Sequence, residues 1–230
     1  MINSVQNEKI KNYAKLNEKK YRDETNMFIV EGLHLVEEAK AYGIVKEVIT
    51  TNPNIDGTLV SEEVMKKLTN QKSVVEVCAI CEKLNKKEIT NKILILDTIQ
   101  DPGNIGTLIR SAVAFGFDTI VMEACADIYS SKVLRATQGA IFKLNIINTN
   151  IIEFIKSLKD YKVYGTSLKN GLPLKQIEKT DKIAIILGNE GNGVRNEILD
   201  ITDKNIFIEI TNMESLNVAV AGAILMYELK

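Results

Sequence analysis

Tryptophan is absent from this chain, and histidine occurs only once, as His34. The three cysteines are too few for a disulfide framework, and their odd number suits a reducing compartment. Cys78 and Cys81 form a CxxC pair, but no second pair and no nearby histidine completes a set of metal ligands. We therefore expect no bound metal and predict a buried strand over 74–80, which includes Cys78 and ends just before Cys81, with a metal or redox role for the pair as the alternative.

Long apolar runs are also missing. No stretch approaches the roughly 20 residues that a membrane-spanning helix needs, and the N-terminus lacks the apolar segment of a secretory signal. This pattern predicts a cytoplasmic protein with no membrane partner. A dominant charge is missing too, because 29 basic residues oppose 30 acidic ones. Any RNA contact must therefore use a local patch rather than a generally basic surface.

Such a patch lies at the start of the chain, where 5–21 has the pattern of a polar helix. Through Arg22, six basic residues oppose two acidic ones, which gives a net charge of +4. A solvated helix face and an RNA-binding surface both fit this run. The candidate RNA contacts are Lys15, Lys19, Lys20 and Arg22.

The rest of the chain alternates strands with helices, and its 45% apolar residues suffice for a core. Strands are predicted at 27–30, 44–50, 74–80, 93–96, 119–122, 144–147, 162–165, 183–187 and 206–210. Helices are predicted at 32–42, 61–68, 105–115, 131–137, 151–158, 194–199 and 218–229. The polar segment 82–91 is the best linker, which divides the chain into domains 1–90 and 91–230. The alternation predicts an α/β fold whose mostly parallel sheet binds its ligand at the carboxyl ends of the strands.

The first conspicuous segment follows the strand at 93–96. Pro102 and Gly103 mark a turn, Asn104 is a good N-cap for the helix after it, and Gly116 can end that helix in the left-handed conformation. Arg110 lies off the apolar stripe of this helix, on the face of Gly106 and Thr107. A solvated arginine and a ligand-facing one remain open for this segment alone.

Two further segments follow the last two long strands. Gly188–Gly193 is a run of turn residues around Glu190, without the Lys-Ser/Thr pair of a phosphate-binding loop or the glycine spacing of a dinucleotide fold. Ser215 is the expected N-cap of the C-terminal helix, whose small residues at 218–223 allow close approach of another subunit. A hydrolase with a nucleophilic Ser215 would need His34, which lies in the other domain.

In this order, the three segments resemble the three motifs of the SpoU (TrmH) family of RNA ribose 2′-O-methyltransferases, a branch of the SPOUT superfamily. The first motif corresponds to 101–112, the second to 187–193, and the third to 214–228. Residues 132–144, which include Arg135, are similar to the segment between motifs. More loosely, residues 1–90 resemble the small α/β substrate-binding domain of many members, an L30e-like fold.

The resemblance implies a deep trefoil knot in the C-terminal domain, a homodimer with active sites at the subunit interface, and S-adenosyl-L-methionine as cofactor. The implied cofactor-binding residues are Leu187, Gly188, Asn189, Gly191, Ile208, Ile210 and Leu216. The implied catalytic residues are Arg110, Asn104, Glu190, Ser215 and Asn217. Because arginine stays protonated in proteins, we expect Arg110 to bind the adjacent phosphate and stabilise the developing alkoxide rather than to act as a base.

The expected reaction is methylation of a ribose 2′-hydroxyl in RNA, with large-subunit ribosomal RNA as the first choice and Arg135 as a further RNA contact. A tRNA substrate is the alternative within the same chemistry. A non-catalytic RNA-binding or ribosome-assembly factor is the alternative from another class, and a nucleotide-binding α/β enzyme is a third.

Overall fold

A computed structural model of the chain describes residues 1–69, 74–83, 88–169 and 171–230. It contains two compact units, the first made of Met1–Asn85 with Asp127–Phe142 and the second of Lys86–Ala126 with Lys143–Lys230. The first unit therefore includes a segment from the second half of the sequence. The division into domains at residue 90 stays a prediction.

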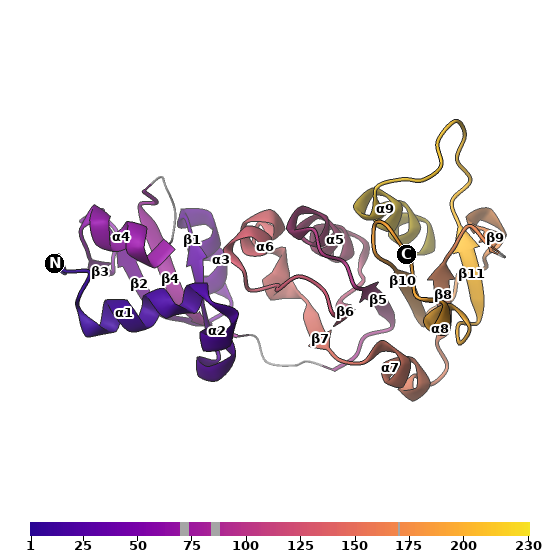
Figure 1. Cartoon of the computed structure of the whole chain (residues 1–230), viewed down its shortest axis with the longest axis horizontal. Helices are drawn as coiled ribbons and strands as arrows, with labels where there is room; N and C mark the ends of the chain where they lie inside the picture. The colour runs from indigo at the N-terminus through magenta and orange to yellow at the C-terminus, as the bar shows by residue number, and fades with distance from the viewer. Residues whose placement is uncertain (70–73, 84–87, 170) are drawn as a thin grey trace. The chain divides into compact units, whose positions relative to one another are not determined.

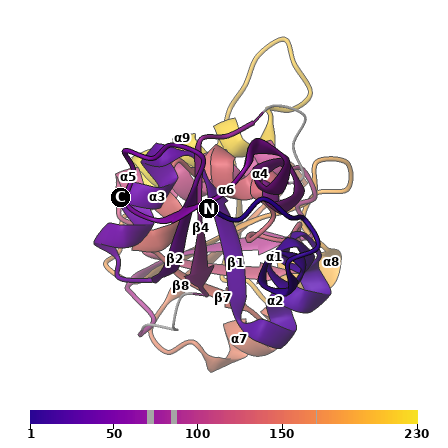
Figure 2. The ribbon, with the colours of Figure 1, turned by 90° about the vertical axis from the view of Figure 1, so that its left-hand side faces the viewer.

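The first unit is built on a four-stranded sheet in the order β1-β4-β2-β3. Strand β4 is antiparallel to β1 and β2, and β3 is parallel to β2. Figure 2 shows α3 on one side of this sheet and α1 with α4 on the other. The elements of the unit are α1 (Glu8–Ala14), η1 (Lys15–Asn17), α2 (Lys19–Thr25), β1 (Met27–Glu31), α3 (Leu33–Ala41), β2 (Val45–Thr50), β3 (Thr58–Leu59), α4 (Glu62–Thr69), β4 (Val77–Glu82), α6 (Ser131–Thr137) and η2 (Ala140–Lys143).

The continuous helix predicted over 5–21 is wrong in its extent. Glu18 has extended backbone angles, φ −102° and ψ 135°, and α2 begins after it. The Arg22 side chain donates a hydrogen bond to the carbonyl oxygen of Leu16 at 2.6 Å, across the break. The helix is thus interrupted where Arg22 packs into the interior, and the helical pattern of the sequence gives no sign of that packing.

The buried strand predicted around the CxxC pair is confirmed, although it begins at Val77. Cys78 and Cys81 are both fully buried. Because they lie three residues apart on a strand, their side chains point to opposite faces of the sheet. Burial raises the pKa of each thiol to about 12, so both are neutral near pH 7. This environment favours a structural role for the pair.

The second unit contains a seven-stranded sheet in the order β7-β6-β5-β10-β8-β11-β9, and every neighbouring pair is parallel. The predicted parallel α/β sheet is confirmed. Strands β3 and β9 were not predicted, because each is only two residues long and is too short to show a periodic pattern. The elements are β5 (Lys92–Asp97), α5 (Pro102–Phe115), β6 (Thr119–Glu123), β7 (Asn145–Asn148), α7 (Ile151–Ser157), β8 (Lys162–Thr166), β9 (Leu172–Pro173), η3 (Leu174–Gln176), β10 (Ile183–Leu187), α8 (Asn196–Leu199), β11 (Lys204–Phe207) and α9 (Val218–Leu229).

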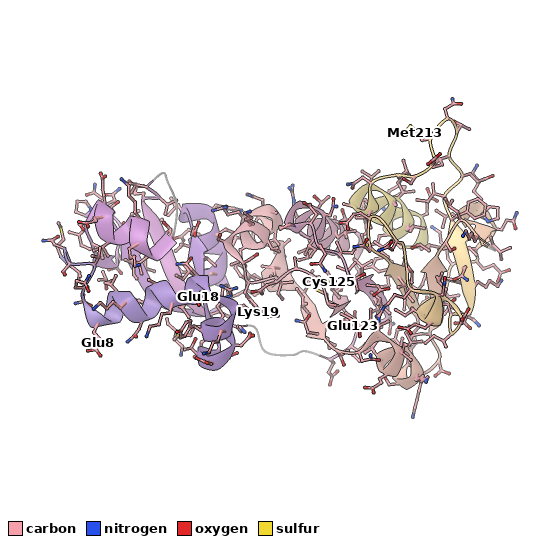
Figure 3. The ribbon with its side chains drawn as sticks, in the orientation of Figure 1. Glu8, Glu18, Lys19, Glu123, Cys125 and Met213 are labelled. Carbon is pink, nitrogen blue, oxygen red and sulfur yellow. The ribbon has the colours of Figure 1, made fainter. Side chains whose placement is uncertain are left out.

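The order of this sheet places the three conspicuous segments at the carboxyl ends of their strands. Strands β5 and β10 are direct neighbours, and α9 packs against α5 (Figure 1). Strand β11 ends at Phe207 instead of 210, and the loop after it extends away from the sheet, with Met213 near its tip (Figure 3). The trefoil knot and the L30e-like fold stay predictions.

Membrane insertion through a helix finds no support in the part of the chain that the structure describes. None of its helices is both long and apolar enough to cross a bilayer.

Candidate active site

The segment after β5 forms a capped helix start. Asp101 is the N-cap of α5, since its side chain accepts a hydrogen bond from the Asn104 backbone N–H at 2.8 Å. The predicted N-cap, Asn104, is therefore wrong by three residues, and the helix begins at Pro102. This shift frees the Asn104 amide for contacts beyond its own helix. Gly116 ends the helix with φ 77°, as predicted.

The segment after β10 closes on itself as a tight turn. Asn189 and Gly193 exchange backbone hydrogen bonds at 3.1 and 2.8 Å, and the Asn189 side chain accepts from the Gly191 N–H at 2.9 Å. A Cβ on Gly188 would lie 2.1 Å from the Gly193 carbonyl carbon, so only glycine fits there. Gly193 adopts φ 70°, whereas Gly191 has no positive φ. Glycine is thus required at the two ends of the turn, for lack of space at Gly188 and for a left-handed backbone at Gly193.

The segment before α9 is capped by Asn217, whose side-chain oxygen accepts from the N–H groups of Ala219 at 2.9 Å and Val220 at 3.3 Å. The predicted N-cap, Ser215, is wrong and lies exposed in the preceding loop. A Cβ on Gly222 would lie 2.4 Å from Leu108 and 2.6 Å from Leu187. This close packing fixes where α9 begins relative to α5 and β10.

A chain of side-chain hydrogen bonds joins the three segments. Asn104 Nδ2 donates to Glu190 Oε1 at 2.9 Å, and Asn217 Nδ2 donates to Asn104 Oδ1 at 3.0 Å. The Asn104 side chain thus donates to the second segment and accepts from the third. Three of the five predicted catalytic residues are brought together by this chain, which we call the Asn104 relay.

Arg110 and Ser215 stand outside the Asn104 relay. Both are exposed, and neither side chain makes a hydrogen bond or ion pair with the described residues. The Arg110 guanidinium is therefore available to an external anion such as a phosphate.

The predicted cofactor-binding residues lie in two segments that differ in burial. Leu187 and Gly188 are buried, Asn189, Ile208, Ile210 and Leu216 are half-buried, and Gly191 is exposed. The backbone N–H and C=O groups of 209–216 make no hydrogen bond within the described structure. A stretch with so many unpaired donors and acceptors fits a ligand that is recognised through backbone contacts.

The predicted RNA-binding residues are only partly accessible. Lys15, Lys19 and Lys20 are exposed, but Arg22 is 5% exposed and its guanidinium pairs with Asp127. The structure therefore gives no support to Arg22 as an RNA contact, because its guanidinium is buried and already paired. Arg135 is 41% exposed in its side chain and donates to Glu31 at 2.9 Å, which engages part of its guanidinium.

A charged cluster that the sequence analysis missed centres on Arg195. Its Nε donates to Asp97 Oδ1 at 2.9 Å and its Nη2 to Glu123 Oε2 at 2.7 Å, with Asp97 fully buried. Partial burial alone would lower the Arg195 pKa, but the two carboxylates raise it overall. Partial burial would raise the Glu123 pKa, but hydrogen bonds from Ile151 and Arg195 lower it. The sequence contained one indication of this cluster: Asp97 and Glu123 each stand at the end of an apolar strand.

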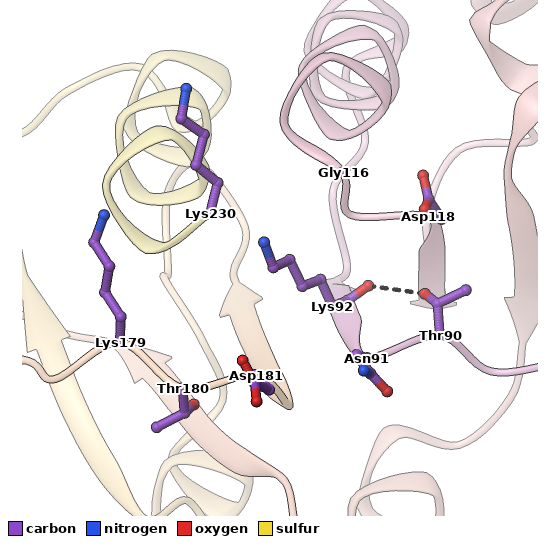
Figure 4. Close-up of a pocket in the computed structure, with 9 residues that line it drawn as sticks. All are labelled: Thr90, Asn91, Lys92, Gly116, Asp118, Lys179, Thr180, Asp181 and Lys230. Carbon is purple, nitrogen blue, oxygen red and sulfur yellow. Dashed lines mark hydrogen bonds between the residues drawn. The ribbon is translucent and has the colours of Figure 1, made fainter.

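Two cavities of this unit are lined by residues outside the Asn104 relay. One of about 470 Å³ opens where β5 and β10 begin, at the other edge of the sheet, with charged side chains from Lys92, Lys179, Lys230, Asp118 and Asp181 (Figure 4). Another, of about 320 Å³, lies beside α9 and includes Ile208 in its lining. No group of three or more His, Cys, Asp or Glu side chains among the described residues could hold a metal ion.

Comparison with known proteins defines the class. Residues 91–227 match the SpoU rRNA Methylase family, and residues 7–94 match the MRM3-like substrate binding domain. The chain belongs to the SpoU rRNA methylase family.

Individual relatives extend over the whole chain. The 23S rRNA (guanosine(2553)-2′-O)-methyltransferase RlmP of Bacillus subtilis is 40% identical, over 100% of this chain and 98% of the relative. A crystal structure described as an AdoMet-bound rRNA methyltransferase from Sinorhizobium meliloti has a TM-score of 0.86 at 28% identity, over 99% of this chain and 96% of that one. An RNA 2′-O ribose methyltransferase structure has a TM-score of 0.81 at 27% identity, over 99% and 97% of the two chains.

Proposed function

We propose that this chain is an S-adenosylmethionine-dependent methyltransferase that modifies a ribose 2′-hydroxyl of large-subunit ribosomal RNA. The Asn104 relay carries this proposal, because it joins the three motif segments of the family through side chains at one edge of the sheet. The full-length similarity to the Bacillus subtilis enzyme supports ribosomal RNA as the substrate class. The guanosine named for that relative is the first position to examine.

The two segments 187–191 and 208–216 would hold the cofactor. The backbone groups of 209–216, which have no partner among the described residues, would supply hydrogen-bonding partners. Bound S-adenosylmethionine supplies a methyl group on a positively charged sulfur.

The chain's own residues then act on the RNA ribose. A 2′-hydroxyl is a weak nucleophile, so it must be held in line with the methyl carbon and lose its proton as the new bond forms. Arg110, which is exposed and whose side chain has no partner among the described residues, is suited to bind the neighbouring phosphate and to stabilise the developing alkoxide. The Asn104 relay orients Glu190 and the start of α9 around the reacting ribose, and Ser215 approaches from the loop.

RNA delivery falls to the N-terminal domain, over residues 1–90, while 91–230 forms the catalytic domain. Lys15, Lys19 and Lys20 are exposed on η1 and α2, where they can neutralise phosphates. Arg135 retains an accessible part of its guanidinium for the same purpose. The ribosomal substrate suggests a cytoplasmic location.

A homodimer through the catalytic domain completes the proposal. On α9, the side chains of Val220 and Tyr227 are 48% and 53% exposed, which leaves apolar surface for a second copy. Light scattering at micromolar concentration should give twice the mass of the 25.7 kDa chain. A value of one chain would contradict the dimer.

Mapping of 2′-O-methyl groups in RNA from cells with and without the gene tests the substrate. We expect one ribosomal position to lose its methyl group when the gene is deleted. Loss at a tRNA position would replace rRNA by tRNA as the substrate, and unchanged methylation in both would favour the non-catalytic RNA-binding alternative.

A further inference from the structure

The glycine-rich turn 188–193 is fastened at both ends to two consecutive residues after β5. At its start, Asn189 Nδ2 donates to the carbonyl oxygen of Thr98 at 3.0 Å. Beyond its end, the Arg195 backbone N–H donates to Asp97 Oδ2 at 3.0 Å, and Arg195 Nε donates to Asp97 Oδ1 at 2.9 Å. The conformation of the turn is therefore coupled to the position of β5.

Arg195 also reaches the next strand. Its Nη2 donates to Glu123 Oε2 at 2.7 Å, and Glu123 is held in turn by Asn150 Nδ2 at 3.1 Å and the Ile151 N–H at 2.9 Å. One guanidinium thus bridges the ends of β5 and β6. A lysine could not do this, because an ammonium lacks the planar set of donors that addresses two carboxylates from fixed directions.

Burial makes this bridge obligatory rather than incidental. The Asp97 side chain is 0% exposed, so its charge would be left without compensation if Arg195 moved away. The remaining arm of the guanidinium, to Glu197 at 3.2 Å, is of a different kind, since the Glu197 side chain is 60% exposed. Such a surface ion pair contributes little to stability.

We propose that Arg195 is a positioning residue for the cofactor turn: by bridging Asp97 and Glu123, it holds 188–193 in the conformation that binds S-adenosylmethionine. This rests on the proposed function, since it assigns the turn to the cofactor. In this proposal Arg195 acts through the turn, by holding Asp97 and Glu123, rather than through its own contact with cofactor or RNA.

The test compares Arg195→Lys with Glu197→Gln in the full-length protein. Calorimetric titration with S-adenosylmethionine should give a Kd raised about tenfold or more for Arg195→Lys, the size expected when a charge-assisted hydrogen bond that orders a binding loop is lost. Glu197→Gln should stay within about twofold, because it removes only the exposed arm. Filter binding to a 23S rRNA transcript should be unchanged for both variants, and saturating cofactor should restore the turnover of Arg195→Lys.

An unchanged cofactor affinity of folded Arg195→Lys would overturn the proposal. A parallel loss of cofactor affinity, RNA affinity and turnover at saturation would also overturn it, because that pattern indicates general damage. If Arg195→Lys does not fold, Glu123→Gln takes its place against the same control and the same two outcomes apply. A wild-type protein that binds no S-adenosylmethionine would instead contradict the proposed function.

Discussion

Asn217 performs two tasks with two different atoms, which allows them to be separated by substitution. Its Oδ1 caps α9 through the N–H groups of Ala219 and Val220, and its Nδ2 donates to Asn104. Asn217→Asp keeps the capping oxygen and removes the donor. Asn217→Ala removes both. The first variant should damage catalysis with little loss of stability, and the second should damage both.

The magnitudes follow from the contacts. Loss of an N-cap costs about 1 kcal/mol, or roughly 2–4 °C in the Tm of a chain of this size, for Asn217→Ala only. In Asn217→Asp, the Asn104 Oδ1 atom would face a carboxylate oxygen with no hydrogen between them, because an ionised aspartate only accepts hydrogen bonds. A polar group left unsatisfied costs about 1–3 kcal/mol, which corresponds to roughly a fivefold to 150-fold loss in kcat/KM if the relay is needed in the transition state.

The assay pairs thermal unfolding with transfer of labelled methyl groups to a 23S rRNA transcript. Near-normal kcat/KM for Asn217→Asp would show that the Asn104 relay has no catalytic role. Equal Tm values for the alanine and aspartate variants would refute the capping assignment.

Three further predictions concern separate parts of the chain. Arg110→Ala should retain S-adenosylmethionine affinity and lose about a hundredfold to a thousandfold in methyl transfer, with partial recovery in Arg110→Lys; near-normal transfer by the alanine variant would remove Arg110 from the mechanism. Neutralising Lys15, Lys19 and Lys20 should reduce the slope of log K against log salt for RNA binding by roughly 0.7–0.9 per lost phosphate contact, and an unaltered slope would leave these lysines as solvated side chains. Glu47 is partly buried, which would raise its pKa, but hydrogen bonds from Lys9, Thr58 and Tyr13 lower it overall. Its folded pKa thus lies below the unfolded value of about 4.3, so urea unfolding should show stability falling as the pH drops below about 5, and Glu47→Gln should flatten that dependence; an identical pH profile would contradict the assignment.

Local chemistry made much of this fold predictable. The helix over 131–137 has the predicted bounds, because Ser130 caps its start and Gln138 ends it in the left-handed conformation. Glycine at 116 ends α5 for the same conformational reason. The choice of N-cap was less predictable, since Ser215 and Asn217 are both good caps. Packing of Gly222 against Leu108 decides between them, and that contact joins distant parts of the chain.

Pairings across long stretches of sequence were beyond prediction. Asn104 meets Glu190 at a separation of 86 residues and Asn217 at 113. The resemblance to a family placed these residues in one site, but it did not say which atoms meet. Arg22 could not be told apart from the other basic residues of its segment, because the sequence shows that a residue is charged but not whether it is buried. Asp97 and Arg195 were missed for the same reason.

The most direct test of the central claim is transfer of a labelled methyl group from S-adenosylmethionine to an unmodified 23S rRNA transcript by the purified protein, followed by digestion to nucleosides. The account predicts that the label elutes as a single 2′-O-methylnucleoside, and that a 2′-deoxy substitution at that position abolishes incorporation. Label on a base, or no incorporation by a protein that binds S-adenosylmethionine and RNA, would contradict it.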